Sequence, residues 1–96
     1  MSSYRLTNQA DSDLFDIFVY GIDIFGEVQA LNYQKELSWV FGLLAENPHL
    51  GRLAPAIGRD IRRHEHASHV ILYEEDMEGI VVLAIIHGRA VSRLRL

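Results

Sequence analysis

The sequence predicts an α+β fold in the order β-α-α-β-β-β, a helical hairpin packed on one face of a small, mostly antiparallel sheet. Two long segments with helical spacing of apolar residues meet at Gly26, and three strand-like segments with short connections follow them. With 96 residues, 49% of them hydrophobic and none of them cysteine, the chain has room for one domain, residues 1–96. Such a core needs neither a disulfide nor a metal.

A short strand over residues 4–7 and a helix from about residue 8 to about residue 25 are expected first. Thr7 is the expected N-cap, and Asp11 and Asp13 place negative charge near the helix N-terminus. At 100° per residue one face of this helix carries an apolar stripe, and a second stripe lies roughly opposite. The first stripe contains Ala10, Leu14, Ile17, Phe18, Ile24 and Phe25, and the second contains Phe15, Val19 and Ile22.

A second helix is expected from about residue 27 to about residue 46, closed by Asn47-Pro48. Its main apolar stripe contains Ala30, Tyr33, Leu37, Val40, Phe41 and Leu44, and a second contains Val28, Trp39 and Leu43. A hairpin needs one face for its partner helix and one for the sheet, so packing explains part of this doubling. The surplus apolar residues, Phe15, Val19, Ile22, Trp39 and Leu43, either enlarge the core or form a docking surface for another chain.

Residues 49–59 contain two glycines and a proline and are predicted to form a loop. Strands are expected over 60–64, 69–74 and 80–87, with hairpin connections over 65–68 and 75–79. The last strand is apolar on both faces. It is therefore expected to lie in the middle of the sheet, with the helices covering at least one side.

The two halves of the chain differ in charge more than the net charge of −4 indicates. Residues 1–48 carry seven acidic and two basic side chains, whereas residues 49–96 carry seven arginines and six acids. Arginine is suited to bidentate capture of carboxylate or phosphate. The acidic total disfavours a general nucleic-acid coat, so an anion-binding surface in the second half is the sharper expectation.

Catalytic and metal-binding constellations are weak in this sequence. His64, His66 and His69 could supply imidazole ligands, but no cysteine or His-Glu-x-x-His pattern accompanies them. The acids over 74–78 are typical of a solvated hairpin tip, and Ser68 and His69 are adjacent on a strand and cannot face each other. We therefore expect no catalytic residue, no cofactor and no metal site.

Arginines flank the predicted strands. Arg62 and Arg63 are expected on opposite faces of one strand, and Arg89 follows His87-Gly88 at the end of the last strand. A sheet face with Arg62 or Arg63, His87 and Arg89 would receive anions, either RNA phosphates or acidic protein segments. Arg5 and Arg59 are better explained as solubilising charge, and Arg93 and Arg95 lie in the tail.

A recognisable series of short segments runs along about nine tenths of the chain. It contains Tyr4-Arg5-Leu6-Thr7, Ala10-Asp11-Ser12-Asp13-Leu14, Ile17, Tyr20, Phe25-Gly26, Gln29-Ala30, Tyr33, Asn47-Pro48, Gly51-Arg52, Ile61-Arg62-Arg63, Ser68-His69-Val70-Ile71-Leu72-Tyr73 and Ile86-His87-Gly88-Arg89. This ordered set resembles ParE-type toxins of bacterial toxin–antitoxin (plasmid stabilisation) modules, within the RelE/ParE superfamily. The resemblance implies a helical hairpin on a small antiparallel sheet, the fold expected above.

The superfamily divides by activity. RelE-like members are ribosome-dependent mRNA endonucleases with basic residues on the sheet and an aromatic near the C-terminus, whereas characterised ParE-like members trap the cleaved-DNA complex of DNA gyrase. Here Val70 stands where ribonuclease members tend to carry Arg, residues 90–96 include no Tyr or His, and no lysine follows Lys35. The gyrase branch is favoured, with no enzymatic step of the toxin's own. An mRNA endonuclease is the alternative, and a non-toxic relative that only binds the antitoxin is a third possibility.

The resemblance also implies partners. A ParD-like antitoxin segment would fold on binding against Phe15, Val19, Ile22, Trp39 and Leu43, and its acids would pair with Arg62 and Arg63. Joined through the antitoxin's DNA-binding dimer, the complex would be a heterotetramer or larger and would touch DNA only through the antitoxin. His87, Arg89, Arg93 and Arg95 are the expected gyrase-facing residues. The N-terminus lacks a secretory pattern and no apolar run is long enough for a membrane span, so a cytoplasmic protein is expected.

Overall fold

The computed structural model describes residues 2–94 and the side chains of residues 2–91. Its elements are β1 (Ser3–Leu6), α1 (Asn8–Phe25), α2 (Glu27–Glu46), the 3-10 helix η1 (Pro48–Leu50), β2 (Arg52–Leu53), β3 (Arg62–His66), β4 (His69–Asp76), β5 (Gly79–His87) and the 3-10 helix η2 (Gly88–Leu94). The predicted α+β class is confirmed. Both helices have their predicted bounds because strong local signals mark them: Thr7 at the start, Gly26 at the junction and Asn47-Pro48 at the end.

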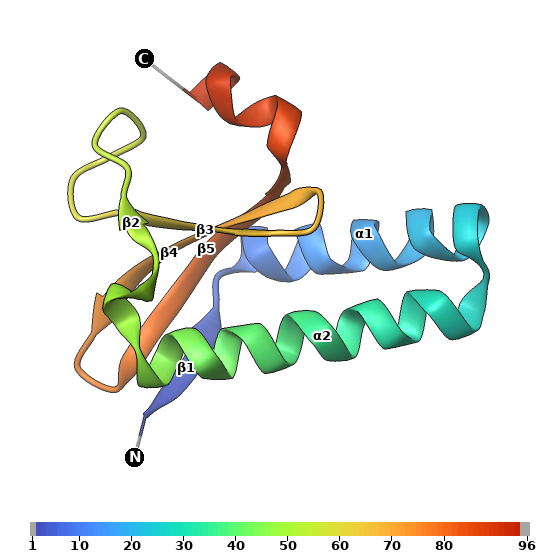
Figure 1. Cartoon of the computed structure of the whole chain (residues 1–96), viewed down its shortest axis with the longest axis horizontal. Coiled ribbons are helices and arrows are strands. Elements are labelled where there is room, and N and C mark those ends of the chain that lie inside the picture. Colours follow the sequence, from blue (N-terminus) through green and yellow to red (C-terminus); the bar gives the residue numbers. More distant parts are fainter. Residues whose placement is uncertain (1, 95–96) are drawn as a thin grey trace.

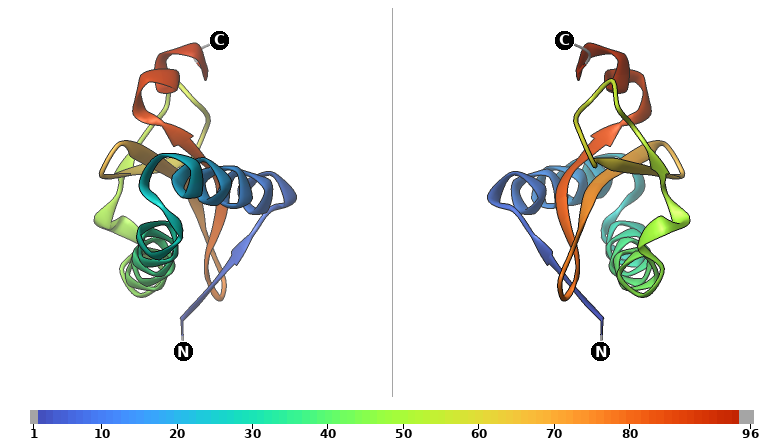
Figure 2. Two further views of the ribbon diagram at one scale, coloured as in Figure 1. Left: turned by 90° about the vertical axis from the view of Figure 1, so that its right-hand side faces the viewer. Right: turned by 90° about the vertical axis from the view of Figure 1, so that its left-hand side faces the viewer.

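The five strands form one twisted sheet in the order β1-β5-β4-β3-β2. β1 pairs parallel to β5, and every other neighbouring pair is antiparallel. The predicted central position of the last strand is confirmed, because β5 has a partner on each edge. Figures 1 and 2 show the helical hairpin on one side of the sheet, while η2 and the loop between β2 and β3 rise together from the other side.

A bulge in β5 anchors the start of α1. The β4–β5 register shifts between Leu72 and Tyr73, which leaves Leu83 as the extra residue. The Thr7 hydroxyl accepts a hydrogen bond from the Ala10 amide at 3.0 Å and donates to the Leu83 carbonyl at 2.8 Å. The Asp13 carboxylate accepts from the Ile85 amide at 2.9 Å. The N-cap therefore serves the helix and the sheet together.

The core lies between the hairpin and the strands β4 and β5. From its predicted main stripe, α2 contributes every residue except Ala30 and the half-buried Tyr33. The bulge in β5 lets Val82 and Ile85 face the helices together. The cluster consists of Ala10, Leu37, Val40, Phe41, Leu44, Ala45, Ile71, Tyr73, Ile80, Val82 and Ile85. On the opposite face Val70 and Leu72 are also buried, so β4 is covered on both sides.

Several local features differ from the sequence predictions, among them the start of β3, which is Arg62 and not the predicted residue 60. Residues 52–53, predicted as loop, form the edge strand β2, which is too short to show periodicity. β3 runs to His66, so the predicted 65–68 connection shrinks to Ala67-Ser68, with Ala67 at φ 52°. A positive φ at alanine is uncommon, and no glycine or asparagine marks the turn in the sequence. β4 likewise continues to Asp76, two residues beyond its predicted end.

The far end of the hairpin extends beyond the sheet (Figure 1). Ile24 and Phe25, which share the first apolar stripe of α1 with the buried Ala10, are 55% and 63% exposed because no strand lies beneath them (Figure 1). Gly26 breaks the two helices with φ 89°, a conformation that favours glycine, and its amide donates to the Ile22 carbonyl. Within residues 2–94, neither this pair nor any other helix has a stretch apolar and long enough to span a bilayer.

Candidate functional site

An apolar seam runs along the solvent side of α1. Phe15, Val19 and Ile22 form it and are 65%, 43% and 38% exposed. Their spacing of four and three residues is the spacing with which one helix meets another. The structure therefore leaves this stripe outside the core. We call Phe15, Val19 and Ile22 the α1 seam.

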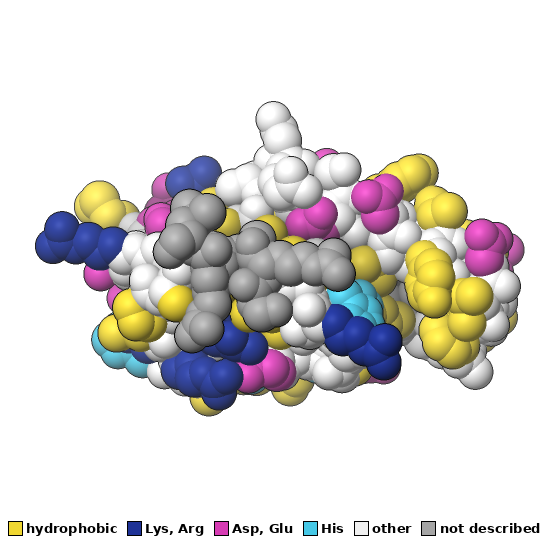
Figure 3. Space-filling view, turned by 90° about the horizontal axis from the view of Figure 1, so that it is seen from above, with side chains coloured by type: hydrophobic (Ala, Val, Ile, Leu, Met, Phe, Trp, Pro, Cys, Tyr) yellow, Lys and Arg dark blue, Asp and Glu magenta, His cyan; other side chains and the backbone are white. Residues whose placement is uncertain are grey.

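The other predicted docking residues lie on α2. Trp39 is 68% exposed, Leu43 is half-buried, and both line a groove together with Tyr4 from β1. Further apolar side chains gather at the hairpin tip, including Val28 and Leu31. Figure 3 shows hydrophobic and acidic side chains side by side over this end of the molecule. The helical half thus presents apolar surface framed by negative charge.

A cavity of about 660 Å³ lies between the hairpin and the β3–β4 turn, and Tyr33, His69 and His87 line it. The Tyr33 hydroxyl lies 2.7 Å from His69 Nδ1, and the rings of His69 and His87 are 5.9 Å apart. Burial, helped by the charge of Glu36, raises the pKa of Tyr33 to about 12. Burial, followed by His87 and His66, lowers the pKa of His69. The Tyr33 hydroxyl is therefore protonated and the His69 imidazole neutral, and a hydrogen bond joins them.

His87 and Arg89 lie next to each other where β5 ends, and both are exposed. The Arg89 amide donates to His87 Nδ1 at 3.2 Å, and the Gly88 amide donates to the Ser68 carbonyl at 2.8 Å. These bonds hold the start of η2 against the β3–β4 turn. The side chain of Arg93 and all of Arg95, the remaining predicted target-facing residues, lie outside the described residues.

Arg62 and Arg63 lie on opposite faces of β3, as predicted from strand alternation. Arg62 pairs with Tyr73, whose side chain points into the core, whereas Arg63 pairs with Leu72 on the other face. The Arg62 guanidinium donates to the Gly51 carbonyl at 2.8 Å, so it fastens the segment before β2. Its predicted contact with a partner remains a prediction.

The expected arginine surface is only partly assembled. Arg63 reaches across the helix-free face and lines a cleft with Gly88, the residue before Arg89. His87, by contrast, lines the cavity on the helix side. Arg52, which the sequence reasoning did not single out, lies opposite Arg63 in the β2–β3 pair. The sequence gives no sign of this position, because Arg52 lies in β2, a strand of only two residues that shows no periodicity.

The three histidines considered as imidazole ligands have separate surroundings. His66 Nε2 lies 3.0 Å from Glu36 Oε1, His69 Nδ1 lies 2.7 Å from the Tyr33 hydroxyl, and His64 lies opposite Ile71 in the sheet. Across the part of the chain that the structure describes, no three His, Cys, Asp or Glu side chains are placed to hold a metal ion.

Comparisons with known proteins match this architecture over nearly its whole length. The family described as "ParE toxin of type II toxin-antitoxin system, parDE" matches residues 4–91. Toxin ParE1 of Caulobacter vibrioides is 30% identical over 96 residues, covering 100% of this chain and 99% of the relative. Toxin ParE1 of Mycobacterium tuberculosis is 32% identical over 89 residues, which cover 92% of this chain and 91% of that relative.

A solved structure described as "Chromosomal ParDE TA system from P. aeruginosa" superposes with a TM-score of 0.75 and covers 91% of this chain and 96% of that chain. At 20% identity it establishes the shared fold. The family match spans every strand and both long helices, and the two relatives align over almost their full lengths. The chain therefore belongs to the ParE toxin family of type II toxin–antitoxin systems.

Proposed function

We propose that this chain is a toxin that binds DNA gyrase and traps its cleaved-DNA complex, and that a ParD-like antitoxin neutralises it. Family membership supports the toxin assignment. The exposed α1 seam is the observation that carries the antitoxin part, because three apolar side chains at helical spacing stay in solvent when the fold is complete. The proposal includes a cytoplasmic location, because that is where both proposed partners act.

The geometry of His87 favours action by binding over catalysis. In a neutral imidazole only one nitrogen has a free lone pair, and a general base must offer that lone pair to its substrate. His87 Nδ1 accepts a hydrogen bond from the Arg89 amide, so a neutral His87 ring has its proton on Nε2. This ring can donate a hydrogen bond to a bound partner but is poorly arranged to remove a proton from a ribose hydroxyl. His69 Nδ1 is engaged by the Tyr33 hydroxyl at 2.7 Å.

One experiment separates the gyrase proposal from an mRNA endonuclease. Purified toxin is incubated with gyrase, ATP and supercoiled plasmid, and in parallel with translating ribosomes. Accumulation of linear plasmid after protein denaturation, without mRNA cleavage, is the expected result. Ribosome-dependent mRNA cuts together with unaffected gyrase would refute the proposal. Expression without antitoxin tests toxicity itself, since a non-toxic relative leaves growth unchanged.

The antitoxin surface is tested with a charge placed in the seam. Val19→Asp should weaken binding of the ParD-like protein by at least about tenfold, because the carboxylate loses water when a partner helix covers it. Tyr20→Asp introduces the same charge at an exposed apolar position of the same helix, turned 100° away from Val19, and is the matched control. Equal affinity of both variants, measured by titration calorimetry, would place the antitoxin elsewhere.

A further inference from the structure

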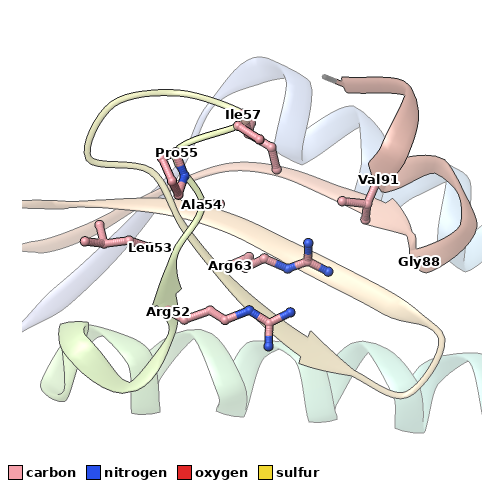
Figure 4. A pocket seen from close by; sticks show the side chains of 9 residues that line it. Arg52, Leu53, Ala54, Pro55, Ile57, Arg63, Gly88 and Val91 are labelled. Atoms are coloured by element: carbon pink, nitrogen blue, oxygen red, sulfur yellow. The ribbon is translucent and has the colours of Figure 1, made fainter. Parts of the chain in front are cut away.

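Two arginines on the helix-free face share one carboxylate. Arg52 Nη2 lies 2.9 Å from Glu65 Oε1, and Arg63 Nη2 lies 3.7 Å from the same oxygen. The strand pairing places the two arginines directly opposite each other, and their guanidinium groups point the same way (Figure 4). One positive charge of this trio is left without a negative partner among the described side chains.

The inner arginine also has an unused donor. Arg63 is largely buried, with 22% of its side chain exposed, and its Nε atom has no hydrogen-bond partner within the described residues. A buried N–H without an acceptor costs free energy, about as much as a lost hydrogen bond. An anion that reached this guanidinium could accept from Nε once the side chain turned toward it, and would balance the surplus charge.

An apolar cleft adjoins this charge. It measures about 430 Å³, and Arg52 and Arg63 form one side of it. Ala54, Pro55, Ile57 and Val91 supply apolar wall from the β2–β3 loop and from η2 (Figure 4). The volume lies in the range of sites that hold a few side chains of a ligand. The cleft therefore offers a charged end and an apolar end side by side.

These features distinguish between the anions that arginine binds. Glu65 already neutralises half of the pair, so the remaining charge matches a singly charged carboxylate better than a phosphate dianion. The whole chain carries a net charge of −4, which opposes a nucleic-acid backbone. The apolar wall fits a hydrophobic side chain, which an acidic peptide has and a phosphodiester lacks.

We propose that this cleft binds an acidic peptide segment, with one carboxylate between Arg52 and Arg63 and a neighbouring apolar side chain against Ile57 and Val91. The source we assign to that segment, the ParD-like antitoxin, rests on the proposed function. The cleft lies on the sheet face opposite the helices, so its occupant and a helix on the α1 seam would contact the toxin from two sides. Such a partner would wrap around the sheet edge.

The test uses a synthetic peptide, so it depends on neither gyrase nor the antitoxin. An acetylated, amidated Leu-Glu-Ile-Glu-Leu peptide is titrated into the full chain while NMR follows the arginine Nε–H resonances. The Arg63 resonance is identified by its loss in Arg63→Gln. It should shift with this peptide and stay unchanged with Leu-Gln-Ile-Gln-Leu. Affinity should fall at least about tenfold in Arg52→Gln and Arg63→Gln.

Arg59→Gln is the matched control, because Arg59 is exposed and lines no part of this cleft. It should bind the peptide within about twofold of the unmodified chain. If Arg63→Gln does not fold, Arg52→Gln, whose side chain is 67% exposed, carries the comparison. An unmoved Arg63 resonance, an equal response to the glutamine peptide, or a stronger response to a short single-stranded oligonucleotide overturns the inference. Each of these outcomes leaves the gyrase result unaffected.

Discussion

Replacing Tyr73 with phenylalanine removes a single oxygen from the largest fully buried side chain among the described residues. Tyr73 is fully buried, and its hydroxyl donates to the Pro48 carbonyl at 2.7 Å and accepts from the Gly51 amide at 2.8 Å. The phenylalanine ring keeps the packing, but both hydrogen bonds are lost and the buried Gly51 amide has no partner. Two net hydrogen bonds and one orphaned donor amount to about 2 to 3 kcal/mol of unfolding free energy.

For a domain of this size that loss corresponds to a melting temperature lower by about 10 to 15 °C. Tyr20→Phe is the control, because Tyr20 is 65% exposed and should change stability by less than about 0.5 kcal/mol. Scanning calorimetry of both variants gives the comparison, and hydrogen exchange should be faster around Gly51 than in β5. A Tyr73→Phe variant that melts within about 2 °C of Tyr20→Phe would refute the assignment of these two bonds as stabilising.

Three further predictions concern the turn, the histidine cavity and the groove. Gly79→Ala should cost about 3 kcal/mol, because Gly79 has φ 148° and an added Cβ would overlap the backbone of β1, whereas Gly42→Ala, with open space around it in α2, should melt no lower than the parent. Burial lowers the pKa of His69 in the folded state. The neutral form of His69 therefore contributes its full stability above the unfolded-state pKa of about 6.5, and this stability is lost as the pH falls through the lower, folded-state pKa. Urea unfolding from pH 7 to pH 5 should therefore lose stability less steeply in His69→Asn, and identical slopes would contradict this. Trp39→Ala should leave the melting temperature nearly unchanged but weaken antitoxin binding about tenfold, and a large loss of stability would instead make Trp39 a core residue.

The helices could be predicted closely because their signals are local. Thr7 caps the start of α1, and Gly26, with its positive φ, separates α1 from α2. These two residues mark the start and the end of α1. β2 was not predicted because a strand of two residues shows no alternation of apolar and polar side chains. The β3–β4 turn was not predicted because Ala67 adopts a positive φ at a position where glycine is the usual residue. At the bulge, Leu83 bonds to Thr7 and Ile85 bonds to Asp13, 76 and 72 residues away in the sequence, so no local pattern reports it.

The site was predictable to the extent that exposure follows from periodicity. The periodicity of α1 groups Phe15, Val19 and Ile22 on one stripe but leaves open whether that stripe is core or docking surface, and the structure leaves all three exposed. The periodicity also groups Phe25 with the buried Ala10, because it cannot show where the sheet beneath a helix ends. Arg52 became visible only through its pairing with Arg63, eleven residues further along the chain, which depends on the strand register.

The parallel pairing of β1 with β5 has a consequence for synthesis of the toxin. Ser3 lies opposite Gly79, and Leu6 lies opposite Val82. β1 is therefore synthesised well before β5, its partner in the sheet. Pairings this distant in sequence form late and slowly. The bulge that anchors the α1 N-cap also belongs to β5. A growing chain therefore cannot complete its sheet until β5 has emerged from the ribosome.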